Sequence, residues 1–423
     1  MKISVFLLTA LLLLSGASAE GDDLPASGGA VSLDSLLMEA RQNNPSIQAA
    51  IETMRAAQET IPQARSFPDP MLRYTLFGSS IETRLGPQRN KISLSQTVPF
   101  FGKLTLKGMI AEAQSELLEA QYKGVVADVT LRVKELFFSL LKLDRDLILL
   151  EKERDLVKRL IKAAASMYEA GKAGQQDVLR SQLELTRLED RQLEFRQSRR
   201  STAALLNMAL NRSADSPVPS LSFGSELPAL GDKEELQAMA LITRPEIKIH
   251  QSLITAREKR LELAKKNSFP DFQVMVEYVD VGGGTTMDLR DGRDAWMASV
   301  GVTLPLWRRK LKADRAEADN LLHASRSQLS AMNLETEAGI HDYLERIGTS
   351  EEQYALYKNV LLPQAEQTLK ASESGYSAGR ADFSALLESQ RMILTVRMGI
   401  DRIFSEIWTD TARLERLVGR DLL

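Results

Sequence analysis

The 423-residue chain contains no cysteine. Disulfide bonds, thiolate metal sites, thiol catalysis and a lipid on an N-terminal cysteine are therefore excluded. Aromatic residues make up only 6% of the chain, which is typical of long helices in one layer rather than of a deep core. The formal net charge is −3, so no large basic field indicates a nucleic-acid partner.

Long apolar runs are also scarce. The one pronounced run, Val5 to Leu14, follows Lys2 and leads to the small residues Ala17-Ser18-Ala19. This pattern predicts a secretory signal peptide over residues 1–19, followed by a linker over 20–32. The run is too short for a spanning helix, which needs about 20 residues. No stretch of 18 apolar residues follows, so a mature chain that enters a membrane is expected to do so as strands.

Motifs of catalysis and cofactor binding are missing as well. Gly171-Lys172 is followed by Ala173, so the pair does not form a phosphate-binding loop ending in Lys-Ser or Lys-Thr. The three histidines occur singly, which predicts helix-surface or seam positions rather than a metal site: His250, His323 and His341. The sequence therefore predicts a protein that is not an enzyme and holds no cofactor and no metal of its own.

An internal repeat is the most informative feature that is present. Four landmarks recur in one order: Asn44-Pro45 with Arg244-Pro245, Ser66-Phe67-Pro68-Asp69 with Ser268-Phe269-Pro270-Asp271, Val98-Pro99-Phe100-Phe101 with Leu304-Pro305-Leu306-Trp307, and Tyr168-Glu169-Ala170-Gly171-Lys172 with Tyr376-Ser377-Ala378-Gly379-Arg380. Basic residues follow both proline junctions closely. A period of about 200 residues is far longer than a solenoid repeat, so it indicates a duplicated half-molecule.

Each half has the same predicted layout. The first repeat covers 33–212 and the second covers 233–423, joined by a linker over 213–232 that is rich in proline. Each repeat is predicted to contain a helix (36–66; 234–268), a strand pair (70–98; 272–304), a very long helix (103–170; 310–377) and a return helix (175–210; 382–419). A glycine turn separates the last two helices.

The long helices have the pattern of a coiled coil. Apolar residues in the second one recur near a 3.5-residue period: Leu322, Leu329, Met332, Ile340, Tyr343, Ile347, Tyr354 and Leu361. Such a narrow seam predicts side-by-side packing with neighbouring helices and a wet opposite face. Each long helix would extend about 100 Å. Pro363 is expected to kink or locally unwind the second one.

The four strand segments alternate apolar and polar residues. Transmembrane strands of about 10 residues show this alternation, and so do half-buried strands of soluble proteins. The signal peptide and the long helices favour the membrane interpretation. Polar loops are expected over 78–90 and 281–294. Four strands cannot close a barrel, so several copies must combine: two would supply eight strands and three would supply twelve.

From about residue 33 to its end, the chain resembles the outer-membrane efflux family typified by TolC. The duplicated design, the Asn-Pro and Arg-Pro helix openings, the strand-Pro-helix junctions and the two Tyr-x-Ala-Gly turns carry this resemblance. Four segments resemble the branch that serves heavy-metal efflux pumps: Ser95–Lys103, Leu362–Ala365, Gly375–Phe383 and Leu386–Arg391.

The resemblance implies a mainly α fold with a small β part. Long coiled-coil hairpins would form a trimeric α-barrel, and four strands per protomer would contribute to a 12-stranded transmembrane β-barrel. It also implies a homotrimer in the outer membrane of a Gram-negative bacterium that extends into the periplasm. The implied partners are a periplasmic adaptor protein and an inner-membrane pump of the resistance-nodulation-division type. The implied function is passive export of small solutes, metal cations in particular.

The resemblance also implies roles for residues at the glycine turns. Gly171 and Gly379 fit left-handed helix ends, and with Lys172 and Arg380 they would form the tip on which the adaptor docks. Tyr376 and Asp177 match a family contact in which an Asp–Tyr hydrogen bond latches the tip closed. The basic residue of that latch is not matched, because Ala381 stands in its place.

Acidic residues after the second turn would face the lumen in the family. Asp382 and Glu388 are the candidates here, and three copies would form rings that attract cations. A further acidic position of the family aligns with Ala385. The alternative for each carboxylate is an ordinary solvated helix face.

Other functions stay open at this point. A channel of the same family could serve drug efflux or type I protein secretion. A periplasmic adaptor also has long hairpins, but it needs a compact β domain flanking a single hairpin. A soluble coiled-coil scaffold is the third alternative, and it would wash off membranes with salt.

Overall fold

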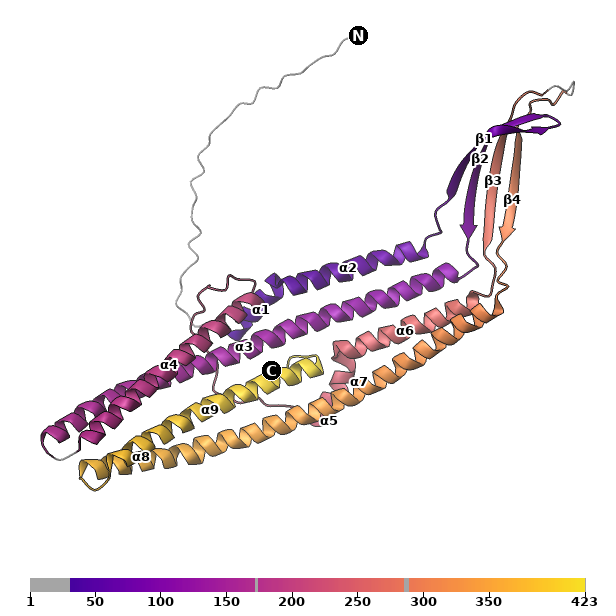
Figure 1. The fold of residues 1–423 in the computed structure, drawn as a ribbon. Helices are drawn as coiled ribbons and strands as arrows, with labels where there is room; N and C mark the ends of the chain where they lie inside the picture. Colours follow the sequence, from indigo (N-terminus) through magenta and orange to yellow (C-terminus); the bar gives the residue numbers. More distant parts are fainter. Residues whose placement is uncertain (1–30, 172–173, 285–288, 423) are drawn as a thin grey trace, which may run out of the picture.

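The computed structural model describes residues 31–171, 174–284 and 289–422. The expected signal peptide over 1–19 and almost all of the linker over 20–32 lie outside these residues, as do Lys172 and part of the expected loop over 281–294. The molecule is long and narrow, with a sheet at one end and the tips of two helical hairpins side by side at the other (Figure 1).

The two halves of the chain repeat one series of elements. The first half contains α1 (Leu33–Asn43), α2 (Pro45–Arg65), β1 (Met71–Thr83), β2 (Gly86–Val98), α3 (Lys103–Glu169) and α4 (Gln175–Ala209). The second half contains α5 (Lys233–Thr243), α6 (Pro245–Lys266), β3 (Phe272–Val281), β4 (Ala295–Val302), α7 (Arg308–Leu356), the π-helical turn η1 (Tyr357–Leu361), α8 (Leu362–Ser377) and α9 (Phe383–Val418).

The first helix of each half differs from the prediction, because it is two helices rather than one. The break falls at Asn44 and at Arg244, which have the extended ψ angles of 122° and 120°. Proline follows each residue, and its ring disfavours the helical conformation of the residue before it. Asn44 then caps α2, because its Oδ1 accepts from the amide of Ser46 at 2.9 Å, while its Nδ2 donates to the carbonyl of Ala209 at 2.8 Å.

The long helices agree with the prediction. α3 has 67 residues, which corresponds to about 100 Å at 1.5 Å per residue. In the second half, the π-helical turn η1 stands immediately before Pro363, where unwinding was expected. Proline has no amide hydrogen and its ring crowds the carbonyl four residues earlier, so the backbone bonds must shift there.

The helices lie side by side in one layer (Figure 1). Toward the sheet the order is α2, α3, α6 and α7, and toward the turns it is α4, α3, α9 and α8. The seam predicted on the second long helix is confirmed: its members are buried or half-buried, with Leu322, Ile340 and Ile347 deepest. Ser325 and Thr336 share this seam because each hydroxyl donates to the carbonyl four residues earlier, at 3.0 and 2.6 Å.

The four strands form one antiparallel sheet in the order β1-β2-β3-β4. The polar loop expected over 78–90 is wrong, because β1 and β2 continue through it to a short turn at Arg84-Leu85. In the described residues, β1 pairs only with β2 and β4 only with β3, so both outer edges are open.

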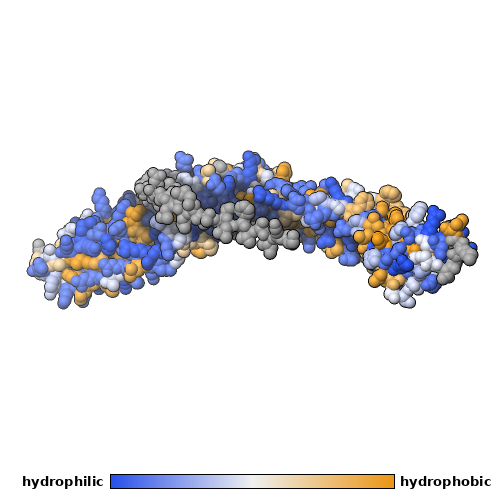
Figure 2. All heavy atoms as spheres, turned by 90° about the horizontal axis from the view of Figure 1, so that it is seen from above, coloured by the Kyte–Doolittle hydropathy of each residue, from blue (hydrophilic) through white to orange (hydrophobic). Residues whose placement is uncertain are grey.

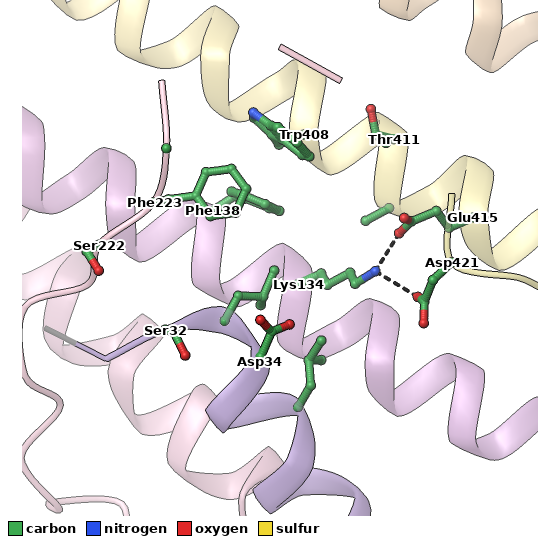
Figure 3. A pocket seen from close by; sticks show the side chains of 14 residues that line it. Ser32, Asp34, Lys134, Phe138, Ser222, Phe223, Trp408, Thr411, Glu415 and Asp421 are labelled. Atoms are coloured by element: carbon green, nitrogen blue, oxygen red, sulfur yellow. Dashed lines mark hydrogen bonds and ion pairs between the residues drawn. The ribbon is translucent and has the colours of Figure 1, made fainter. Parts of the chain in front are cut away.

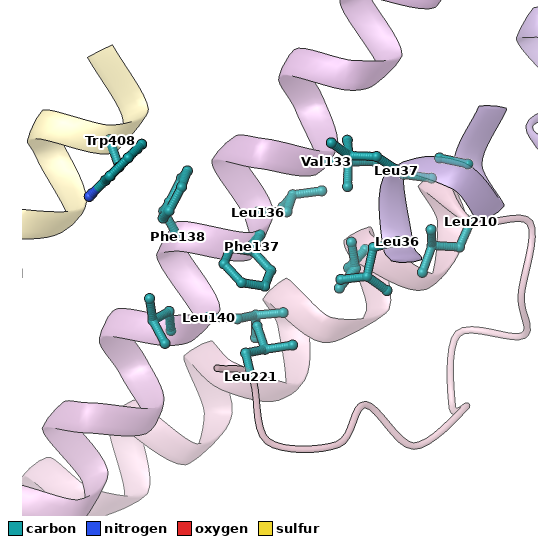
Figure 4. Packing of buried hydrophobic residues seen from close by; sticks show 14 of the residues in the cluster. Leu36, Leu37, Val133, Leu136, Phe137, Phe138, Leu140, Leu210, Leu221 and Trp408 are labelled. Atoms are coloured by element: carbon teal, nitrogen blue, oxygen red, sulfur yellow. The ribbon is translucent and has the colours of Figure 1, made fainter. Parts of the chain in front are cut away.

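The largest apolar cluster packs between α1, α3, α4 and α9 (Figure 4). Residues from both halves meet there: Leu36 and Leu37 of α1, Val133, Phe137, Phe138 and Leu140 of α3, Leu206 of α4, Leu221 of the linker, and Phe404 and Trp408 of α9. Phe137 is fully buried. This cluster fixes the second half against the first.

Candidate functional site

The sheet has one apolar and one polar face. Cross-strand partners Leu72, Leu94, Val276 and Ala298 share a face because neighbouring strands place opposed residues on the same side. Several apolar side chains of this face are strongly exposed: Leu72 (71%), Leu76 (69%), Trp296 (75%) and Val300 (69%). Figure 2 shows hydrophobic side chains gathered at this end of the molecule, on the right.

The opposite face carries polar and charged side chains. Lys91 and Glu277 form an ion pair there at 2.9 Å, and Ser93 is buried beside them. A monomeric soluble protein rarely exposes an apolar surface of this extent, which is typical of contact with a membrane or with protein. Among the described residues, no helix is both long and apolar enough to cross a bilayer.

A polar clamp joins the sheet to the helices where β2 ends and β3 begins. Lys103 is buried, and its Nζ donates to the Asp271 carboxylate at 2.7 Å and to the Phe269 carbonyl at 3.0 Å. The amide of Phe100 donates to the same carboxylate at 2.8 Å. Partial burial would raise the pKa of Asp271, but these hydrogen bonds and the Lys103 charge hold it below the ordinary value. Phe100 and Phe269 stack beside the clamp with ring centroids 4.7 Å apart.

The hairpin tips are built as the sequence predicts. Gly171 and Gly379 have φ angles of +68° and +66°, in the left-handed region that favours glycine. In the second turn, the amide of Gly379 donates to the Tyr376 carbonyl at 3.0 Å and that of Arg380 to the Gly375 carbonyl at 2.8 Å. This is the Schellman arrangement, which satisfies the last carbonyls of a helix. Arg380 is exposed at the tip.

The expected latch between Tyr376 and Asp177 is not formed as a hydrogen bond in this single protomer. The Tyr376 hydroxyl is buried and has no hydrogen-bond partner in the described chain. Its ring instead packs against Phe383, with centroids 5.2 Å apart. Burial and the nearby carboxylates of Asp177 and Asp382 raise the pKa of Tyr376. The two residues are therefore neighbours at the tip, and the bond between them stays a prediction.

The two carboxylates proposed for the lumen lie on the surface of the tip region. Asp382 is the N-cap of α9, but its side chain makes no capping hydrogen bond, and Glu388 is exposed six residues later. The Glu184 carboxylate, and after it that of Glu388, raises the pKa of Arg391. Asp382 also acts on Asp177: burial, followed by this carboxylate, raises the Asp177 pKa.

The sequence missed the polar contacts that join the two hairpins. Arg391 on α9 binds Glu184 on α4, with its Nε 2.9 Å from the carboxylate. Glu153 on α3 lies close by, and burial raises its pKa to about 7, with Arg397 opposing and Glu184 reinforcing the shift. The buried stripe of α4 explains the miss, because it is largely polar: Ser181, Glu184, Leu188 and Gln192. The spacing of that stripe is the one signal that could have revealed it.

A cavity of about 710 Å³ lies near the middle of the molecule, between α1, α3, α9 and residues 222–224. Lys134 reaches into it and binds Glu415 at 2.6 Å and Asp421 at 3.0 Å (Figure 3). Phe138 and Trp408 form its apolar end. Lys134 and Glu415 are both buried, so this pair ties the long first helix to the C-terminal one.

Within the described ranges, no three His, Asp or Glu side chains come together as a metal-binding group. His323 and His341 lie on the helix surface, 3.9 Å from Asp319 and 3.8 Å from Glu345. Residues 31–422, apart from the undescribed gaps, thus show no preformed metal centre.

These features define an elongated, duplicated protein with an apolar sheet face at one end and two glycine-turned hairpin tips at the other. Residues 36–212 match the family model of the outer membrane efflux proteins. The resemblance stated from the sequence is therefore confirmed.

Relatives that cover nearly the whole chain support this resemblance. The cobalt-zinc-cadmium resistance protein CzcC of Cupriavidus metallidurans is 23% identical over 93% of this chain and 91% of its own length. Among solved structures, the outer membrane protein VceC of Vibrio cholerae has a TM-score of 0.77 at 17% identity, covering 92% of this chain and 97% of that one. CusC, described as forming a transmembrane channel, has a TM-score of 0.75 at 14% identity, with 92% of each chain covered. These two structures show the shared fold.

Proposed function

We propose that the protein is one protomer of a homotrimeric outer-membrane channel that exports small solutes, metal cations in particular, and catalyses no reaction. The observation that carries this proposal is the sheet: one face is apolar and exposed, the other is polar, and both edges are open. Edges open to lipid leave backbone groups unsatisfied, so other copies must supply the missing strands. The match to the outer membrane efflux family model and the similarity to the relative named for cobalt, zinc and cadmium resistance support the efflux role.

In the proposed assembly, three sheets close into one cylinder in the outer membrane of a Gram-negative bacterium. The helices continue this cylinder across the periplasm for about 100 Å. Their narrow apolar seams pack against one another, and the polar remainder of each helix lines a water-filled duct. Transport through such a duct is passive, so energy comes from a partner, an inner-membrane pump of the resistance-nodulation-division type.

The hairpin tips are the proposed contact with a periplasmic adaptor. Gly171, Gly379, Lys172 and Arg380 would form this docking surface. The two glycine turns lie side by side at the end of the molecule farthest from the sheet, which favours this role (Figure 1). We also propose that the buried hydroxyl of Tyr376, unbonded in this protomer, donates to Asp177 when the tip closes.

Cation preference is proposed to come from Glu388 and Asp382. Both carboxylates are exposed near the tip, and three copies at a constriction would attract cations and repel anions. The basic neighbour Arg391 weakens the field of Glu388, so the preference is expected to be moderate.

Planar-bilayer conductance of the purified protein tests the channel and its selectivity together. We expect ion-conducting pores, a lower cation-to-anion permeability ratio for Glu388→Gln, and an unchanged ratio for Glu52→Gln, a surface control on α2 that pairs with Arg55. Tyr376→Phe should raise the basal conductance if the latch forms. Absence of pores from well-folded protein would refute the channel, and equal ratios in the two glutamine variants would refute the acidic ring.

Sensitivity of a deletion strain tests the cargo. Loss of the protein should lower resistance to cobalt, zinc or cadmium salts, because the pump would lack its exit duct. Unchanged metal resistance together with lowered resistance to organic drugs would move the proposal to drug efflux.

A further inference from the structure

The clamp between Lys103 and Asp271 joins the two halves of the chain. The internal repeat supplies the residues for a second clamp of this kind, but a single chain does not bring them together. Within one protomer, Lys103 after β2 binds Asp271 before β3, and Phe100 stacks on Phe269 beside them. This clamp holds the last residues of the first strand pair against the first residues of the second pair. It therefore seals the boundary between the two repeats.

The internal repeat places equivalent residues on the two outer edges of the sheet. Phe67 and Asp69 precede β1 in the first copy of the Ser-Phe-Pro-Asp motif. Phe269 and Asp271 occupy the same positions in the second copy, before β3. After β4, Leu306 is the residue following Pro305, as Phe100 is the residue following Pro99. Arg309 is the fourth residue after its proline, which is the position of Lys103 in the first repeat.

None of these four edge residues has its repeat-equivalent contact within the protomer. β1 and β4 lie at opposite edges of the sheet, so the two halves of the second clamp cannot meet in one chain. Phe67 is 59% exposed and Leu306 is 71% exposed. Asp69 and Arg309 are also exposed, and neither side chain has an ion pair or hydrogen bond in the described part of the protein. The edge at β1 thus carries an acidic and an aromatic side chain, and the edge at β4 carries a basic and an aliphatic one. The two edges are complementary in charge and in apolar surface.

We infer that the β4–α7 edge of one copy docks on the β1–α2 edge of a second copy, so that Arg309 binds Asp69 and Leu306 packs on Phe67. The occupant of each edge is therefore another copy of this chain, and the inference rests on the trimer of the proposed function. An arginine can donate two hydrogen bonds to one carboxylate, so it can replace the lysine of the internal clamp. The amide of Leu306 already donates to the Leu304 carbonyl at 2.9 Å, so this second clamp uses side chains alone.

The same equivalence sets the register between the strands of neighbouring copies. β2 and β3 pair with Leu94 opposite Val276. Their repeat equivalents in β4 and β1 are Val300 and Tyr74, so Val300 of one copy lies opposite Tyr74 of the next. Both side chains are exposed in the single chain, and this register continues the apolar face of the sheet without interruption. A shift by one residue would turn these apolar side chains to the polar face.

Cysteine pairs test the geometry, because the natural chain has no cysteine to give a background reaction. Phe67→Cys combined with Leu306→Cys, treated in membranes with a short bifunctional thiol reagent, should yield covalent dimers and trimers. Phe100→Cys combined with Phe269→Cys is the matched control, and it should react within one chain and keep the monomer mass. Either edge substitution alone should give no trimer.

Charge exchange tests the ion pair. Asp69→Arg and Arg309→Asp should each lower the trimer-to-monomer ratio in detergent at least about tenfold, because each replaces a charge-assisted contact by a like-charge one at every interface. The double exchange should restore the ratio. Arg308→Asp changes the charge equally at the neighbouring position and should leave the ratio within about twofold of the natural protein.

The outcomes separate this inference from the function on which it rests. If the natural protein is trimeric by native mass but the Phe67→Cys/Leu306→Cys variant never cross-links between copies, the clamp is overturned and the channel still stands. Equal losses for Arg308→Asp and Arg309→Asp likewise overturn it. A natural protein that is monomeric in membranes overturns both the clamp and the proposed function.

Discussion

Removing the half-buried carboxyl of Glu153 should stabilise the protein at high pH and do little at low pH. Glu153 lies on α3, close to the polar contacts that join the two hairpins, and burial raises its pKa from the ordinary 4.5 to about 7. The ionised form is thus disfavoured in the folded protein. Arg397 offsets part of this penalty, whereas Glu184 adds to it.

The size of the effect follows from these two pKa values. At about 1.4 kcal/mol for each tenfold change in proton affinity, the difference corresponds to about 3 kcal/mol. Glu153 is only partly buried, so solvent screening reduces this to about 1.5 kcal/mol. Below pH 4.5 the carboxyl is protonated in both states and costs nothing. The cost grows as pH rises from 4.5 to about 7, because the unfolded chain ionises first, and it is constant above that.

Urea unfolding followed by helical circular dichroism measures this difference. Glu153→Gln should raise the free energy of unfolding by about 1.5 kcal/mol at pH 8 and by much less at pH 4.5. Glu151→Gln removes an exposed carboxylate from the same helix and should change neither value by more than about 0.5 kcal/mol. A gain at pH 8 that matches the one at pH 4.5, or the same gain in both variants, would refute the reasoning.

Four further substitutions should shift the free energy of urea unfolding. Lys134→Met leaves the buried Glu415 without its 2.6 Å partner and should cost about 3 kcal/mol, most of which Glu415→Gln in the same chain should recover. Phe137→Ala empties a fully buried position of the central core and should cost about 3–5 kcal/mol. Gly379→Ala should cost about 1 kcal/mol because of its φ of +66° alone, since an added Cβ meets nothing within 4 Å. Gly348→Ala, equally unobstructed but inside α7, should instead stabilise by about 0.5–1 kcal/mol; costs of equal sign at the two glycines would contradict the backbone argument.

Features that depend on a few neighbouring residues were predictable from the sequence. The glycine turns, the unwinding before Pro363 and the ends of the long helices all agree with the structure. Each of these follows from the allowed backbone angles of one residue or from the missing amide hydrogen of a proline. The break at Asn44 belongs to the same class, because the following proline signals it, and a continuous helix was the wrong expectation there.

The extended hairpin of β1 and β2 shows where composition misleads. Residues 78–90 are polar, which is typical of a loop, yet they continue both strands. The side chains there are largely exposed, so no apolar alternation marks them. Pairing with the neighbouring strand, rather than burial, decides their conformation, and a single segment carries no information about its partner.

The sequence by itself determined the duplicated plan, the helical seams and the alternation of the strands, because these are periodic along the chain. Only the tertiary structure decided which charges meet. Glu184 finds Arg391, Lys134 finds Glu415 and Lys103 finds Asp271, each across more than 150 residues of chain. Such pairs depend on which helix lies beside which. The sequence around an acidic or basic residue looks the same whether or not a partner faces its side chain. For the same reason, Asp69 and Arg309 became visible as an unmatched pair only after the strand order had placed them at opposite edges.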